Sequence, residues 1–238
     1  PSTQVFCTNL GMDLIRITNQ GGSYTYSWTL NGAPFTQTTA DISIAAGGTY
    51  EVTATNTLTG CETTKTIVVN ESEFPLFDLN DLTVFDLTGD GSNRIEILTG
   101  IGALGIGDYE FSLNGGPYQD SPVFDDVPPG LHQVSVRDKN GCGTKSVTAS
   151  VVGYPLYFTP NGNGQDDNWQ VLGVNGVFQS QSLIYIFDRH GRLLAQISPS
   201  GPGWDGTYNG TPMPADDYWF RVGLEDGRTF TGHFSLIR

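Results

Sequence analysis

The side chains whose type and spacing could bind a ligand are oxygen donors in two turn-rich segments. In the first, Asp86, Thr88 and Asp90 alternate along the chain, Gly91 follows, and Asn93 lies nearby. Alternating oxygen donors around a glycine turn are the pattern that a hard cation such as Ca²⁺ selects. We therefore expect a calcium site there, outside the EF-hand class, because an apolar residue stands where an EF-hand carries its closing carboxylate.

The second segment offers Asn161, Asn163, Asp166 and Asp167 within seven residues. It is also a calcium candidate. Either segment can instead be a polar turn held by hydrogen bonds from Asn and Asp side chains to nearby backbone N–H groups. The sequence leaves both alternatives open.

The remaining candidates for catalysis are histidines and adjacent aspartates, and they indicate no known reaction. A glycosidase needs two carboxylates on opposite sides of a cleft, which adjacent residues do not supply. No GxSxG, HExxH or glycine-rich phosphate loop occurs. We expect a protein that is not an enzyme. The residues considered are His132, His190, His233 and the pairs Asp125-Asp126, Asp166-Asp167 and Asp216-Asp217.

Cys7, Cys61 and Cys142 are the cysteines of the chain. They form no CxxC pair, which argues against a zinc site. Cys7 and Cys61 flank the first and last strands expected in the N-terminal third, so we expect a disulfide between them that stabilises a small domain. The alternative is two separate buried thiols. Cys142 is expected to be unpaired.

Composition favours short strands joined by many turns. The 238 residues include 31 glycines and 13 prolines, and no long run has apolar residues at helical spacing. The net charge of −14 argues against binding to a nucleic-acid backbone. No apolar run reaches the length of about 20 residues that spans a bilayer. The chain starts without methionine, and we expect it to be the C-terminal fragment of a longer secreted protein.

Two similar segments follow one another in the first two thirds of the chain. TYSWTLNGAPF is matched by YEFSLNGGPYQ, and Gly60-Cys61 by Gly141-Cys142. Such a repeat is typical of tandem modules in a stalk. We expect an all-β chain of three tandem Ig-like β-sandwich modules: residues 1–70, 71–153 and 154–238.

The first module should contain five strands, with Trp28 in its core and a tight turn at Asn31-Gly32. In one of them, Tyr50, Val52 and Ala54 share a face. The expected strands are Met12–Thr18, Tyr24–Leu30, Ile42–Ile44, Thr49–Thr55 and Thr63–Val69.

In the last module, the run SLIYIFD places apolar residues on both faces of a strand, which predicts a central position in a sheet. Trp204 and Trp219 are expected in the core, and Asp205 should accept hydrogen bonds from its own turn. The final two strands should pair across Asp226-Gly227, with the last strand near a sheet edge that a partner can reach.

The segment GDYEFSLNGGPYQDSPVFDDVPPGLHQVSVRDKNGC resembles the SprB-type repeat of surface adhesins in gliding Bacteroidetes. Residues 1–70 are more loosely similar to the PKD-like or immunoglobulin-like modules of the same proteins.

Residues 154–238 resemble a more specific family, the gliding-motility-associated C-terminal domain, which is the type B sorting domain of the type IX secretion system. The likeness covers about 85 residues in one uninterrupted order. The sequence departs from the family pattern at Asn163, Asp166, His190 and Asp217. The residues that carry the family motif are Pro160, Asn161, Gly162, Gly164, Asp167, Trp169, Phe187, Arg189, Gly191, Trp204, Asp205, Gly206, Gly232 and Arg238.

This resemblance implies a secreted adhesin or gliding-type surface protein that passes through the periplasm to the outer cell surface. The implied partners are the type IX machinery and an outer-membrane protein of the SprF/PorP family. The alternative is a carbohydrate-binding accessory region of a secreted polysaccharide-degrading enzyme. That alternative requires exposed aromatic pairs such as Tyr24 with Tyr26, or Tyr109 with Phe111.

Overall fold

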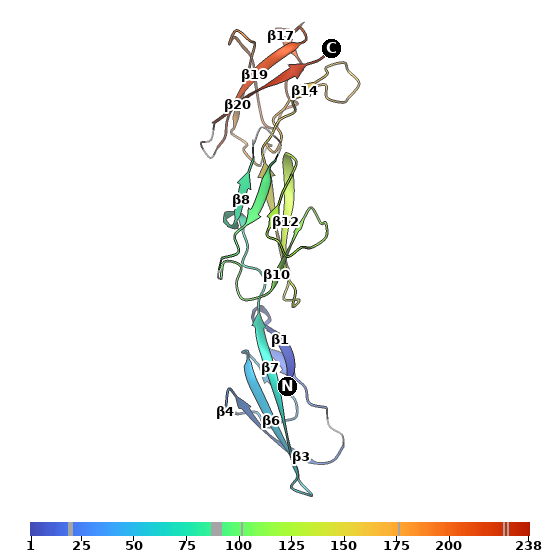
Figure 1. The fold of residues 1–238 in the computed structure, drawn as a ribbon, viewed down its shortest axis with the longest axis vertical. Helices are drawn as coiled ribbons and strands as arrows, with labels where there is room; N and C mark the ends of the chain where they lie inside the picture. Colours follow the sequence, from blue (N-terminus) through green and yellow to red (C-terminus); the bar gives the residue numbers. More distant parts are fainter. Residues whose placement is uncertain (19–20, 87–91, 101, 176, 226, 228) are drawn as a thin grey trace. The chain divides into compact units, whose positions relative to one another are not determined.

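The computed structural model describes the whole chain except residues 19–20, 87–91, 101, 176, 226 and 228. The described residues form strands, turns and two short 3-10 helices, η1 (Thr8–Leu10) and η2 (Leu79–Asp81) (Figure 1). The predicted all-β fold class is confirmed. Among the described residues, no helix has the length and apolar character needed to cross a membrane.

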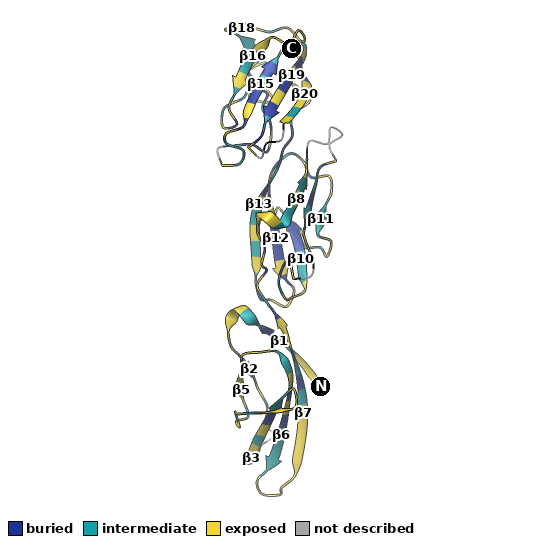
Figure 2. Cartoon of the chain, turned by 90° about the vertical axis from the view of Figure 1, so that its left-hand side faces the viewer, coloured by how far each residue is buried: buried dark blue, intermediate teal, exposed yellow. Residues whose placement is uncertain are grey.

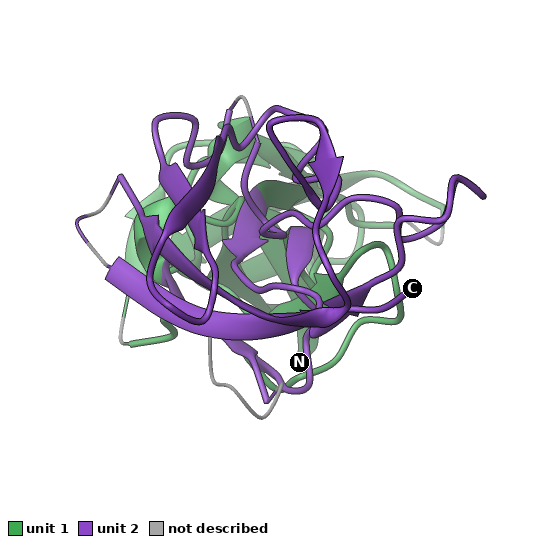
Figure 3. Cartoon of the chain, turned by 90° about the horizontal axis from the view of Figure 1, so that it is seen from above, with its two compact units in different colours: residues 1–81, 98–122, 134–147 green, residues 82–97, 123–133, 148–238 purple. Residues whose placement is uncertain are grey.

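The chain divides into two compact units, shown in different colours in Figure 3. Residues 1–81, 98–122 and 134–147 make the first unit, and residues 82–97, 123–133 and 148–238 make the second. The units alternate along the chain, and the module boundaries at residues 70/71 and 153/154 stay predictions.

A five-stranded sheet, ordered β1-β7-β6-β3-β4, forms the N-terminal part of the first unit. Tyr50, Val52 and Trp28 point into its core and are almost fully buried, as the alternation of apolar residues predicts. The Asn31-Gly32 turn joins β3 to β4 with positive φ at both residues, which a two-residue hairpin of this kind requires. The strands are β1 (Ser2–Cys7), β3 (Tyr24–Leu30), β4 (Ala33–Phe35), β6 (Gly48–Asn56) and β7 (Glu62–Ser72), with β2 (Asp13–Ile15) and β5 (Ile42–Ile44) paired separately.

The predicted Cys7–Cys61 disulfide is wrong, because Cys7 is bonded to Cys142 and Cys61 is a free, exposed thiol. The reason is strand β1, which lies before the first strand expected from the sequence. It runs parallel to β7, so Cys7 lies beside Ser72 at the end of β7. Cys61 precedes the opposite end of the same strand, roughly 35 Å away at about 3.3 Å per residue. The prediction that Cys142 is unpaired is wrong for the same reason.

Hydrogen bonds surround this disulfide inside the first unit. The Ser72 hydroxyl donates to the buried Asp138 carboxylate at 2.8 Å, and the Cys142 backbone N–H donates to the same carboxylate at 3.0 Å. The Asn9 side chain donates to the Cys142 carbonyl at 3.3 Å and accepts the Phe74 N–H at 3.2 Å. The unit also contains β10 (Tyr109–Leu113), which pairs with β12 (Gly130–Asp138); β12 in turn pairs with β13 (Thr144–Val151).

The second unit contains a small sheet, ordered β11-β9-β8, and the C-terminal sheet, ordered β14-β20-β19-β15-β16. The C-terminal sheet covers an aromatic core in which the Trp169 ring stacks on the Phe234 ring at 4.0 Å between centroids. The strands are β8 (Leu82–Phe85), β9 (Arg94–Ile97), β11 (Val123–Phe124), β14 (Tyr157–Phe158), β15 (Leu183–Phe187), β16 (Leu193–Ile197), β17 (Thr207–Tyr208), β18 (Thr211–Pro212), β19 (Asp216–Gly223) and β20 (Thr229–Leu236).

Strand β15 has neighbours on both sides, β16 and β19, as its apolar sequence predicts. The prediction that Trp219 is in the core is wrong, since 41% of this side chain is exposed. Tyr218 and Phe220 are buried and point inward from β19, and the alternation of a strand then turns Trp219 outward. The predicted pairing of the last two strands is confirmed; Asp226 itself lies outside the described residues.

Strand β20 lies one strand in from the sheet edge. The short strand β14 runs parallel to its end, with Tyr157 beside Ser235 and Phe158 beside Leu236. The end of the chain is therefore paired rather than open, which refines the expected edge position.

Candidate functional site

Most residues of the family motif gather at the end of the C-terminal sheet where the chain stops, near β14 and β17, which are labelled in Figure 1. Gly232 instead lies midway along β20, opposite Phe220. Four segments meet at this end of the sheet: residues 159–169, the β15–β16 turn, residues 204–212 and residues 236–238. The Arg192 guanidinium lies over the Tyr208 ring at 5.0 Å, which joins the second segment to the third. We take this cluster of four segments as the candidate site.

Asp167 holds the first segment together. Its carboxylate accepts the backbone N–H groups of Asn161, Gly162 and Gly164 at 2.9, 2.6 and 2.7 Å. The hydrogen bonds from Gly162 and Gly164 are the main cause of a lowered pKa for Asp167. The Asn161 side chain in turn accepts the Asn163 N–H at 3.0 Å. This network is the turn alternative that the sequence left open.

Calcium binding in this segment stays a prediction, as it does for the first candidate segment. Asp86 accepts the Val152 N–H at 2.9 Å, and buried Asn93 donates to the Val127 carbonyl at 3.1 Å. The other two predicted ligands, Thr88 and Asp90, lie outside the described residues. Within the described part of the chain, no three His, Cys, Asp or Glu side chains group closely enough to share a metal ion.

Trp169 and Trp204 connect the first segment to the third. Their backbones form an antiparallel bridge, with N–H to carbonyl distances of 2.9 and 2.8 Å. Both indoles are buried, and each indole N–H has an acceptor: the Pro155 carbonyl at 2.9 Å for Trp169 and the Thr207 carbonyl at 2.8 Å for Trp204. These two motif residues therefore belong to the core and hold together the loops at this end of the sheet.

Asp205, Gly206 and Arg238 shape the third segment. Asp205 accepts the backbone N–H and the hydroxyl of Thr207, as predicted. Gly206 has φ of +78°, and a Cβ there would lie 2.9 Å from a Leu236 methyl carbon, so both the backbone and the space require glycine. The Arg238 guanidinium donates to the Gly206 carbonyl at 3.4 Å and to the carbonyl of Met213, just after this segment, at 3.1 Å. The last residue of the chain thus anchors the segment.

The β15–β16 turn depends on Asp188. Its carboxylate accepts the N–H groups of His190 and Arg192 at 2.9 and 3.0 Å, and the Arg192 bond is the main cause of its lowered pKa. Gly191 has φ of +77° in the turn. Arg189 forms an exposed ion pair with Asp216 at 3.5 Å.

Phe187 differs from the other aromatic motif residues, because its side chain points to the outer face of the sheet. There it lies opposite Trp219 in the β15–β19 pair. Sequence reasoning missed the outer face, although the strict alternation in DDYWFRVG already places Trp219 and Arg221 on the side opposite Tyr218 and Phe220.

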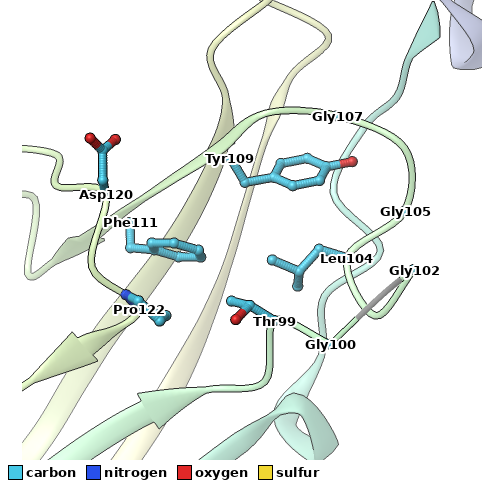
Figure 4. A pocket seen from close by; sticks show the side chains of 10 residues that line it. All are labelled: Thr99, Gly100, Gly102, Leu104, Gly105, Gly107, Tyr109, Phe111, Asp120 and Pro122. Carbon is cyan, nitrogen blue, oxygen red and sulfur yellow. The ribbon is translucent and has the colours of Figure 1, made fainter.

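The aromatic pairs required for carbohydrate binding do not form open platforms. Phe111 is 3% exposed, and the Tyr109 hydroxyl lies 3.1 Å from the Ile106 carbonyl. Both rings line a hollow of about 350 Å³ together with Leu104 and several glycines (Figure 4). Tyr24 and Tyr26 are half-buried.

Residues 152–236 match the family model described as the CHU_C type IX secretion signal domain. No curated protein matches the chain. Among solved structures, the four N-terminal Ig domains of Dscam1 isoform 7.44 match with a TM-score of 0.36 and 9% identity, over 99% of this chain and 75% of that one.

Titin domains I67–I69 match with a TM-score of 0.33 and 10% identity, over 99% of this chain and 94% of that one. PorZ, an essential surface component of the type IX secretion system of Porphyromonas gingivalis, matches with a TM-score of 0.31 and 14% identity, over 81% of this chain and 29% of that one.

Proposed function

We propose that this chain, whose C-terminal domain is a type IX secretion signal domain, is the exported and surface-retained end of an adhesin or gliding-type protein. The family match over residues 152–236 is the observation that carries the proposal. A domain of this family marks a protein for export across the envelope, to the cell surface or the extracellular space. The modules before it would serve as a stalk.

The structural roles of the motif residues support the proposal that a partner recognises this domain in its folded state. Trp169, Trp204 and Gly206 fix the core and the loops at the end of the sheet, and Arg238 ties the last residue to that end. A partner that reads this signal would therefore meet a preformed surface. We propose the type IX machinery as that partner, together with an outer-membrane protein of the SprF/PorP family.

Export of a reporter tests this function. The whole 238-residue chain is fused behind a fluorescent reporter with a periplasmic targeting signal, in a bacterium with a working type IX system. The control is the same fusion ending after Val151. We expect surface fluorescence only with the complete chain. Periplasmic retention of the complete fusion would refute the proposal, and export that persists without the SprF/PorP-family protein would refute that partner alone.

A further inference from the structure

The outer face of the C-terminal sheet carries large apolar side chains where solvent-facing strands usually carry polar ones. Leu183, Leu193 and Trp219 are 48%, 46% and 41% exposed, and Tyr185 and Phe187 on β15 are half-buried. Figure 2 colours the strands that carry them, β15, β16 and β19, by burial. We call these five residues, together with Arg221, the outer sheet face.

Two hollows lie on this face and share Phe187 and Arg221. One, of about 490 Å³, is lined by Leu183, Tyr185, Leu193 and Gly223 in addition to the shared pair. The other, of about 410 Å³, adds Trp219 and the motif residues of the β15–β16 turn. The hollows join the outer sheet face to the candidate site.

The core does not require these side chains. Ile184 and Ile186 supply the inward face of β15, and both are fully buried. The outward side chains of β15 belong neither to the core cluster nor to the partly buried side chains packed against it. Strand β15 therefore has the sequence of a strand covered on both faces, while the described residues cover one face.

The charge on the outer sheet face indicates which kind of partner surface could bind there. Arg221 lies between Tyr185 and Thr231 in the sheet register, and no described residue forms an ion pair with it. The neighbouring arginines are paired, Arg189 with Asp216 and Arg192 with Asp188. In a chain of net charge −14, this face thus presents a positive group next to aromatic and apolar side chains, with the hydroxyl-bearing Tyr185 and Thr231 on the two neighbouring strands. It is complementary to a surface with a carboxylate among apolar side chains.

The same features favour a protein over a sugar or a second copy of the chain. Trp, Tyr and Arg, adjacent here, are the residue types that dominate binding energy at protein interfaces. A sugar presents hydroxyl groups on all sides, and the first hollow offers polar groups from Tyr185 and Arg221 alone. A symmetric second copy would bring two Arg221 guanidinium groups together in a desolvated interface.

We propose that the outer sheet face is the docking surface for the protein component of the export machinery that reads this domain, through an acidic and apolar patch on that component. This inference rests on the proposed function and adds the surface and the chemistry of its partner.

Substitutions on the exposed positions test the surface in the complete reporter fusion. Trp219→Ala removes the largest apolar group, and Arg221→Glu reverses the charge without touching the core. Leu156→Ala is the matched control, because Leu156 is 66% exposed in the same domain and directly precedes β14, at the opposite edge of the sheet from β16. We expect surface fluorescence to fall about tenfold or more for each face variant, as at an interface hot spot, and to stay unchanged for the control.

Thermal unfolding of the purified variants distinguishes a loss of docking from a loss of folding. Retention of a face variant in the periplasm with an unchanged unfolding temperature supports the docking surface. Normal export of both face variants overturns it and leaves the proposed function standing. Export followed by release into the medium also overturns it, since the face then binds a surface component instead. If the unsubstituted chain is not exported, the proposed function fails and the docking surface with it.

Discussion

Cys7 and Cys142 are bonded to each other across 135 residues of sequence, with their Cα atoms 5.4 Å apart. When the chain is pulled from its two ends, tension passes from Cys7 directly to Cys142. Residues 8–141 are then outside the loaded path while the disulfide is intact. We infer that this bond protects residues 8–141 from unfolding under force.

Single-molecule stretching should show this protection directly. In the oxidised chain, unfolding should release only the segments outside the disulfide. After reduction, an additional extension of roughly 450–490 Å should appear, at about 3.3–3.6 Å per residue. Cys61→Ser, the control, should behave as the unsubstituted chain. Equal extension before and after reduction would refute the inference.

Removal of the disulfide should also lower the free energy of unfolding at equilibrium. Closing a loop of 135 residues stabilises a protein by about 5 kcal/mol in the chain-entropy model, which is an upper bound here. Cys142→Ser should therefore lower the denaturant midpoint of the first unit, while Cys61→Ser should not. Equal midpoints for the two variants would contradict the assignment.

Gly232 should be essential for the packing of the C-terminal sheet. A Cβ at this position would lie 2.7 and 2.9 Å from ring carbons of Phe220 and 3.0 Å from the Tyr154 hydroxyl. We expect Gly232→Ala to lower the free energy of unfolding by about 1–3 kcal/mol through overpacking. Gly223→Ala is the matched control, since it has open space at the Cβ position in the adjacent strand. Equal stability of both variants in chemical denaturation would be inconsistent with this packing.

The Asp167 network should make the C-terminal domain sensitive to acid. Because hydrogen bonding lowers the folded-state pKa of Asp167, its stabilising contribution is present above the unfolded-state value of about 3.9 and is lost as the pH falls through the folded-state pKa. In the Asp167→Asn variant, the unfolding temperature should therefore fall less steeply between about pH 4 and pH 2 than in the unsubstituted chain. The neighbouring variant Asp166→Asn should keep the original slope. A pH profile unaffected by Asp167→Asn would exclude this role.

Tyr109 should contribute to stability until strongly alkaline pH. Burial, together with the Glu73 and Asp138 carboxylates, raises the pKa of Tyr109 to about 12. A raised folded-state pKa means that the contribution is complete below the unfolded-state value of about 10 and is lost as the pH rises toward 12. Tyr109→Phe should remove that part of the alkaline transition, measured by unfolding temperature against pH. An unchanged alkaline transition would contradict this role, because it would mean that the pKa of the Tyr109 hydroxyl is the same in the folded and unfolded states.

The sequence by itself determined the strands and turns that depend on near neighbours. Strands β3 and β5 have the predicted ends, and Asn31-Gly32 forms the predicted hairpin turn. The motif of the C-terminal domain was also readable, because its glycines and tryptophans occupy positions that local geometry and core packing restrict.

Only the tertiary structure decided which distant residues meet. The pairing of Cys7 with Cys142 depends on β1 running parallel to β7, a contact between strands that lie far apart in the sequence and that no local pattern encodes. The position of Trp219 depends on which face of β19 meets the core. A large aromatic residue suits either face, and its neighbours Tyr218 and Phe220 take the inward one. Register and strand direction set these outcomes, and both are properties of the whole sheet.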